Sequence, residues 1–216
     1  MKHAIKILCT VILSICLSGC FDIFQHITVN DRGVQQNTIK ITVSKGIIRM
    51  AESFSSEQSF DDRELDKMLD EIISEEHYQD YSASITKIND TTDIGILLDM
   101  AIDYRDKNTV DTINKDNIDF IPKYYRNAMV IHISNSDSSS SQLENNDKIN
   151  EFSALFGKYR ILINKKCINT IDHVGVRTNT GETNIDFLDV YDAYLIEIPI
   201  SAILAESVDI IMYLKL

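Results

Sequence analysis

The chain has 216 residues, of which 44% are hydrophobic, and a formal net charge of −12 at pH 7. That apolar content is ordinary for a globular protein, so a buried core is expected. The excess of acidic residues argues against nucleic acid as a partner, because phosphate binding requires a basic surface. It also argues against purely electrostatic attachment to anionic lipid headgroups.

The first twenty residues have the features of an export signal. Lys2, His3 and Lys6 make a basic start. Residues 7–17 form an apolar run of signal-peptide length, too short to span a bilayer comfortably. Residues 17–20 then read Leu-Ser-Gly-Cys. This arrangement resembles the bacterial lipobox, in which the cysteine is lipidated and becomes the first residue of the mature protein.

The lipobox resemblance implies three parts for the chain. Residues 1–19 are a lipoprotein signal peptide, residues 20–25 are the lipidated cysteine and a tether, and residues 26–216 are a single ectodomain. Acyl chains such as palmitate on Cys20 attach the protein to a membrane of the bacterial cell envelope, with the ectodomain outside the cytoplasm. The alternative is an ordinary secretory signal that happens to end in a cysteine, although such signals usually end in an A-x-A-like site.

Cysteine usage limits how the domain is stabilised. Cys9 and Cys16 lie in the signal and Cys20 carries lipid, so Cys167 is the one cysteine left. An intrachain disulfide is therefore excluded, and the stability of an exported domain has to come from its core.

The mature chain begins with a pattern typical of a β-hairpin. Residues 27–29 and 39–43 alternate apolar and polar side chains, and residues 30–33 (Asn-Asp-Arg-Gly) form a turn signal between them. Residues 21–25 are expected as a short tether or as the lead-in to the first strand.

A helix is predicted from Asp61. Asp61 is a natural N-cap, and Glu64 follows three residues later, as in a capping box. An apolar stripe follows at helical spacing, made of Leu65, Met68, Leu69, Ile72 and Ile73. The opposite face carries Asp66, Asp70, Glu71 and Glu75. We interpret this acidic face as solvated rather than as a cation site.

The middle of the chain predicts a second hairpin and then loops. Residues 83–88 and 96–104 have strand patterns on either side of a turn at 89–93. Residues 107–117 are polar and predict a loop. After a break at Ile121-Pro122 and a short strand at 129–134, residues 135–147 are rich in Ser, Asn and Asp and predict a mobile, exposed loop.

The last third predicts a short helix at 149–156 and then mostly strands. Residues 159–163, 194–200 and 208–216 alternate in polarity. A hairpin is expected across Asn179-Thr180-Gly181, between strands at 174–177 and 185–188. Together the patterns predict an α+β fold: an antiparallel sheet built from hairpins, covered on one face by short amphipathic helices.

Motifs of catalysis are absent from the sequence. It contains no G-x-S-x-G, H-E-x-x-H or C-x-x-C pattern and no Gly-rich phosphate loop. The histidines of the mature chain are widely separated. They are His26, His77, His132 and His173. A nucleophile and base could be imagined from Cys167 and His173, but no third orienting group is in view. We therefore expect no enzyme, no metal site and no cofactor.

Both ends of the mature chain resemble bacterial lipoprotein ectodomains of the LppM type. The resemblance rests on Thr28-Val29-Asn30-Asp31-Arg32-Gly33, Thr42-Val43-Ser44-Lys45, Asn179-Thr180-Gly181 and Leu195-Ile196-Glu197-Ile198-Pro199-Ile200. It implies an α+β envelope module, with lipid or glycolipid binding proposed for some members. Many such proteins carry a C-terminal membrane helix, whereas this chain reaches Leu216 without one. No binding residue is carried over.

The sequence thus favours a non-enzymatic, membrane-anchored envelope lipoprotein with a protein-interaction or envelope-maintenance role. Its partners are the membrane, through lipid on Cys20, and an envelope protein. The first alternative is a module that binds a lipid or another apolar ligand between sheet and helices. A hydrolase is the third hypothesis, and a cluster of histidines and carboxylates in one cleft would favour it.

Overall fold

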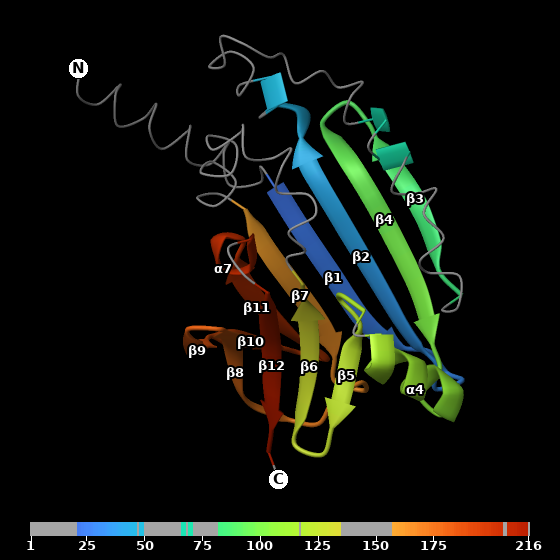
Figure 1. Ribbon diagram of the computed structural model, residues 1–216, viewed down its shortest axis with the longest axis vertical. Helices are drawn as coiled ribbons and strands as arrows, with labels where there is room; N and C mark the ends of the chain where they lie inside the picture. Colours follow the sequence, from blue (N-terminus) through green and yellow to red (C-terminus); the bar gives the residue numbers. More distant parts are fainter. Residues whose placement is uncertain are drawn as a thin grey trace, which may run out of the picture.

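The computed structural model describes residues 21–46, 48–49, 66–67, 69–70, 82–116, 118–134, 157–204 and 207–215. Two β-sheets dominate these residues, and the smaller sheet lies across one end of the larger one (Figure 1). The larger, sheet A, has seven strands. Across the sheet they are β10 (Phe187–Val190), β11 (Ala193–Pro199), β7 (Lys158–Asn164), β1 (Phe21–Val29), β2 (Gln35–Ser44), β4 (Asp93–Ile102) and β3 (Ser84–Asn89).

The first predicted hairpin is confirmed as β1 and β2, which pair antiparallel from Phe21↔Val43 to Val29↔Gln35. The turn between them is closed by the Asn30 carboxamide, whose Oδ1 accepts from the backbone N–H groups of Arg32 and Val34. Residues 21–25 were expected as a tether or as the lead-in to the first strand, and the structure shows the second of these. The strand already begins at Phe21, because the alternating pattern extends back to Ile23, which is buried.

The second predicted hairpin is also confirmed, as β3 and β4. Asp90 closes its turn by accepting from the backbone N–H groups of Thr92 and Asp93. These turn bonds hold the pKa of Asp90 below its usual range. Asp90 thus has a structural role in this turn, because its carboxylate accepts hydrogen bonds from backbone N–H groups.

The smaller sheet, sheet B, comes from the second half of the chain. Its strands, in order across the sheet, are β5 (Pro122–Tyr125), β6 (Ala128–Ile133), β12 (Val208–Leu214), β8 (Ile171–Thr178) and β9 (Gly181–Ile185). All of its pairings are antiparallel. As expected, the last strand ends the described chain inside a sheet, between β6 and β8.

One prediction about fold class needs correction. Sheet A is mixed, because β1 and β7 pair in parallel from Asp22↔Lys158 to Ile27↔Ile163. The described residues are mostly strand, with two labelled helices, α4 (Lys107–Asp116) and α7 (Ser201–Leu204). The described residues therefore form a two-sheet structure. Within them, the predicted cover of short amphipathic helices on one face of a sheet is not seen.

Helix α4 replaces the loop predicted at residues 107–117. Asp106 is its N-cap, accepting from the backbone N–H groups of Asn108 and Thr109 and from the Thr109 hydroxyl. On its inner side Ile113 is 1% exposed. The helix was missed because only Val110 and Ile113 of its ten residues are apolar, too few to stand out as a stripe.

The core fills the space between the two sheets. Inward side chains of both sheets and the connecting segments form one cluster. Its fully buried members include Ile27, Ile161, Ile163, Ile196 and Ile198 of sheet A, and Met129, Ile131, Val174, Ile210 and Met212 of sheet B. Large aliphatic side chains occupy the position in which the alternative hypothesis requires an apolar ligand.

A buried polar cluster crosses this core. The carboxamide of Gln25, on β1, donates to Asn37 Oδ1 and to the carbonyl of Phe120, each at 2.7 Å. It also accepts from the Tyr159 hydroxyl, and burial raises the pKa of Tyr159 well above its usual range. Asn37 Nδ2 donates to the same Phe120 carbonyl. Sheet A is thereby tied to the segment that enters sheet B.

Several predicted elements lie outside the described residues. They are the signal peptide and Cys20, the polar loop at 135–147, the helix at 149–156 and most of the helix from Asp61. Of that last helix, residues 66–67 and 69–70 are described as helical, and Leu69 is half-buried. Asp66 and Asp70 each lie 2.8 Å from Lys87 Nζ on β3. Part of the acidic face expected to be solvated thus contacts an edge strand.

Candidate functional site

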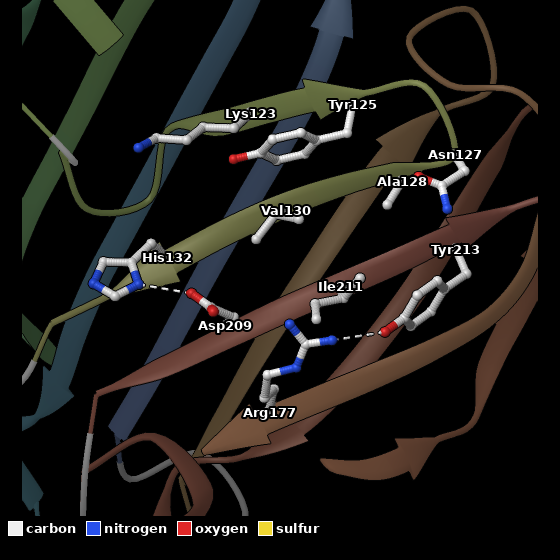
Figure 2. Close-up of a pocket in the computed structure, with 10 residues that line it drawn as sticks. All are labelled: Lys123, Tyr125, Asn127, Ala128, Val130, His132, Arg177, Asp209, Ile211 and Tyr213. Atoms are coloured by element: carbon white, nitrogen blue, oxygen red, sulfur yellow. Dashed lines mark hydrogen bonds and ion pairs between the residues drawn. The ribbon is translucent and has the colours of Figure 1, made fainter. Parts of the chain in front are cut away.

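A hollow of about 510 Å³ lies on the outer face of sheet B, the face turned away from sheet A (Figure 2). It is lined by Lys123, Tyr125, Asn127, Ala128, Val130, His132, Arg177, Asp209, Ile211 and Tyr213. Strands β5, β6, β12 and β8 supply nearly all of these side chains, because alternate residues of a strand face the same side of a sheet. The volume falls in the range of small-molecule sites, about 300–1,000 Å³.

The strand register sorts the lining into three rows that run across the sheet. The first row is aromatic, with Tyr125 opposite Ala128, Ala128 opposite Tyr213, and Tyr213 opposite His173. The small Ala128 thus lies between two tyrosines. With strands about 4.8 Å apart, the two tyrosine backbones are about 10 Å apart. Ala128, which is 7% exposed, lines the hollow between them.

The second row forms the floor of the hollow. It consists of Lys123, Val130, Ile211 and Gly175 in register. Ile211 is only 3% exposed and Lys123 only 8% exposed. Burial lowers the pKa of Lys123, and the nearby charge of Asp209 opposes that shift. Gly175 leaves room for a neighbour, since a Cβ there would lie 2.4 Å from Glu182 Oε1.

The third row is polar, with His132, Asp209 and Arg177 opposite one another. His132 Nδ1 and Asp209 Oδ1 are 2.7 Å apart. Arg177 is paired with Glu182 of β9 at 2.9 Å. The row thus contains one guanidinium–carboxylate ion pair and one contact between an imidazole nitrogen and a carboxylate.

Tyr213 is held rigidly between these rows. Its hydroxyl donates to the Glu182 carboxylate at 3.0 Å and accepts from Arg177 Nη2 at 3.0 Å. One face of its ring stacks on His173, with centroids 4.3 Å apart. The Glu182 contact raises the pKa of Arg177, while burial is the first cause that raises the pKa of Tyr213. The ring is thus fixed in place before any ligand arrives.

Cys167 and His173, considered above as a nucleophile and its base, have other partners in the structure. Cys167 is half-buried and donates to the Ile27 carbonyl at 3.6 Å. Burial raises its pKa to about 11, so the neighbouring Lys165 and Lys166 do not produce a thiolate at neutral pH. His173 instead contacts Asp172 and Tyr213.

The remaining predicted residues are dispersed. His26 lies on β1 in sheet A, while His77 and Cys20 lie outside the described residues. Within the described ranges, no three His, Cys, Asp or Glu side chains are grouped to hold a metal ion. In the same ranges, no helix is both long and apolar enough to cross a membrane.

Sequence reasoning did not identify the hollow. Alternation marks Tyr125, Val130 and Ile211 as facing one side of their strands, but it does not reveal that β6, β12 and β8 are neighbours. That order arises from pairings between residues nearly eighty positions apart, such as His132 with Asp209. A pattern of neighbouring residues does not indicate such long-range pairings.

No protein-family model matches the chain, and no curated protein matches it. Among solved structures, the NMR structure of the folded domain of LppM from Mycobacterium tuberculosis is similar with a TM-score of 0.39 and 6% sequence identity, over 90% of each chain.

Proposed function

We propose that this protein is a non-enzymatic lipoprotein of the bacterial cell envelope, anchored through Cys20, whose folded domain binds another envelope component. The role is one of interaction or envelope maintenance. The lipobox-like sequence at residues 17–20 supports the anchor, and the hollow on sheet B supports a recognition surface.

The observation that carries this proposal is the position of β1. The strand begins at Phe21, the residue after Cys20, and Ile23 and Gln25 are already buried. A lipid on Cys20 would therefore join the membrane to a packed sheet without an intervening tether. An ordinary secreted domain has no need for a cysteine at that position.

The strand register defines which end of sheet A would face the membrane. The end of sheet A that contains Phe21 also contains the end of β2 at Ser44, the start of β7 at Lys158, the start of β4 at Asp93 and the end of β11 at Pro199. Sheet B lies toward the opposite end of sheet A (Figure 1). Lipid on Cys20 would then hold the hollow away from the bilayer, accessible to other envelope molecules.

The two other hypotheses are less well supported. An apolar ligand between the sheets would have to displace side chains such as Ile27, Ile161 and Met212, which are fully buried. A hydrolase with a Ser, Thr or Cys nucleophile would need that residue beside His132 and Asp209, and the residues that line the hollow include none of the three.

Replacing Cys20→Ala tests the anchor. The variant is expected to move from the membrane fraction to unprocessed precursor or soluble material, and to lose metabolic labelling with palmitate. Each methylene buried in the bilayer contributes about 0.8 kcal/mol, so losing two or three acyl chains abolishes stable attachment.

The matched control is Cys167→Ala, which removes the cysteine that remains in the folded domain. It should partition and label like the parent protein. Normal labelling and membrane partition of the Cys20→Ala variant would disprove the lipobox interpretation.

A further inference from the structure

We propose that the hollow on the outer face of sheet B is a binding site for a neutral oligosaccharide. This inference rests on the envelope role proposed above, since it names the class of component that the domain binds. Four features of the hollow point to this ligand: its paired aromatic rings, its already buried floor, its internally paired charges and its place on a sheet face.

The aromatic row gives the site its shape. Tyr125 and Tyr213 project from the same face of sheet B on either side of Ala128 (Figure 2). Tyr125 is 55% exposed, and Tyr213 is immobilised by Glu182, Arg177 and His173. The exposed ring of Tyr125 therefore offers a flat aromatic surface, beside a fixed second tyrosine, on which a ring with apolar C–H faces can stack.

The floor argues against an acyl chain as the ligand. Ala128 and Ile211 are 7% and 3% exposed, so covering them removes little further apolar surface from water. Hydrophobic stabilisation scales with the area buried, at about 25 cal/mol per Å². The aromatic surface still open to contact belongs to Tyr125, a phenol ring with a polar tip, and the hollow is open to solvent rather than enclosing.

The charges argue for a neutral ligand. Arg177 is paired with Glu182, and Asp209 Oδ1 lies 2.7 Å from His132 Nδ1. Lys123, the other cation of the lining, is only 8% exposed and lies near the charge of Asp209. An anionic ligand would meet these carboxylates, and a cationic ligand would meet the guanidinium. Hydroxyl groups both donate and accept, so a sugar can hydrogen-bond to the guanidinium and to the carboxylates without breaking either pair.

The position of the hollow argues against a peptide strand. Peptides commonly bind sheets by adding a strand to an edge, where backbone groups are free. The hollow lies over β6 and β12, which are interior strands whose backbone groups are used by neighbours on both sides. Recognition here has to use side chains, namely planar polar groups and aromatic faces.

The test measures binding of triacetylchitotriose, maltotriose and mannotriose, each separately, to the full chain in a detergent without a sugar headgroup. Titration calorimetry and ligand-observed NMR are the readouts. At least one trisaccharide should bind, with an affinity that is the same at low and high salt because the ligand carries no charge.

Two variants locate the binding in the hollow. Tyr125→Ala removes an exposed ring, and Ala128→Leu fills the space between the rings from an outward-facing position. Each should weaken binding by about tenfold or more. Tyr191→Ala removes a tyrosine that is 95% exposed outside the hollow, so this variant should bind like the parent protein.

Failure of all three sugars to bind at millimolar concentration would overturn the proposal. Unchanged affinity in Ala128→Leu would overturn it as well, as would binding of decanoate that is lost in Tyr125→Ala. None of these results would alter the membrane partition of the chain, so they are distinguishable from a failure of the Cys20 anchor.

Discussion

A Gly95→Ala variant should lose about 3 kcal/mol or more of unfolding free energy, although the change adds a single methyl group. Gly95 lies in β4, between Thr42 of β2 and Ile88 of β3. A Cβ at this position would lie 1.9 Å from the Ile41 carbonyl oxygen and 2.9 Å from the Thr42 Cα.

Both of those contacts are with backbone, so no side chain can rotate away to relieve them. The β2 and β4 strands would have to separate, which weakens their hydrogen bonds in addition to the usual overpacking cost of about 1–3 kcal/mol. For a domain of this size the loss corresponds to a fall in Tm of about 6–12 °C, measurable by calorimetry.

The matched control is Gly46→Ala. Gly46 lies in the helical turn after β2, and a Cβ there would meet only the Ser44 Oγ at 3.5 Å. Alanine favours helix over glycine, so the stability of this variant should be equal or slightly higher. A Gly95→Ala protein as stable as the Gly46→Ala protein would contradict the close approach of β2 and β4.

The second large effect is expected from Gln25→Ala, which should cost about 3–5 kcal/mol. The substitution removes a fully buried side chain that bonds to Asn37, Phe120 and Tyr159. A buried polar group left without a partner costs about 1–3 kcal/mol, and the cavity adds to this. Urea unfolding followed by circular dichroism gives the free energy directly.

Gln36→Ala and Gln25→Met separate the contributions. Gln36 is half-exposed on the opposite face of β2, so its loss should cost under about 0.5 kcal/mol. Gln25→Met keeps the volume and loses the hydrogen bonds, so it should remain clearly destabilised. If Gln25→Met were as stable as the parent protein, the polar cluster would contribute nothing to joining the two sheets.

The elements that sequence reasoning predicts well are those whose signal is local. The β1–β2 and β3–β4 hairpins combine strict alternation with turns capped by Asn30 and Asp90. The strand β12 was recognised from alternation alone. In each of these elements, the residues that determine the strand pairing or the buried face lie within about twenty positions of one another.

The features that sequence reasoning misses depend on partners far along the chain. The parallel pairing of β1 with β7 joins Ile27 to Ile163 across the whole of β2 to β6. The rise in the pKa of Cys167 comes from burial against β1, which outweighs the adjacent lysines that the sequence displays. Helix α4 was missed for a different reason, since the Asp106 cap was present but the apolar stripe was weak.

The hollow illustrates the same limit at the level of function. Its tyrosines lie at positions 125 and 213, on strands that pair with opposite edges of β6. Alternation alone identifies each ring as exposed or buried, but only the strand order places Ala128 between them. A binding surface built from residues so far apart in the chain has no local sequence motif by which it could be recognised.

The most direct test of the account is mass spectrometry of the N-terminal peptide from protein extracted from bacterial membranes. We expect a chain that starts at Cys20 and carries the added mass of acyl chains, because the lipobox-like residues 17–20 lie directly before the strand that begins at Phe21. A mature chain that retains residues 1–19, or that is cleaved elsewhere and carries an unmodified Cys20 thiol, would contradict the proposed anchoring.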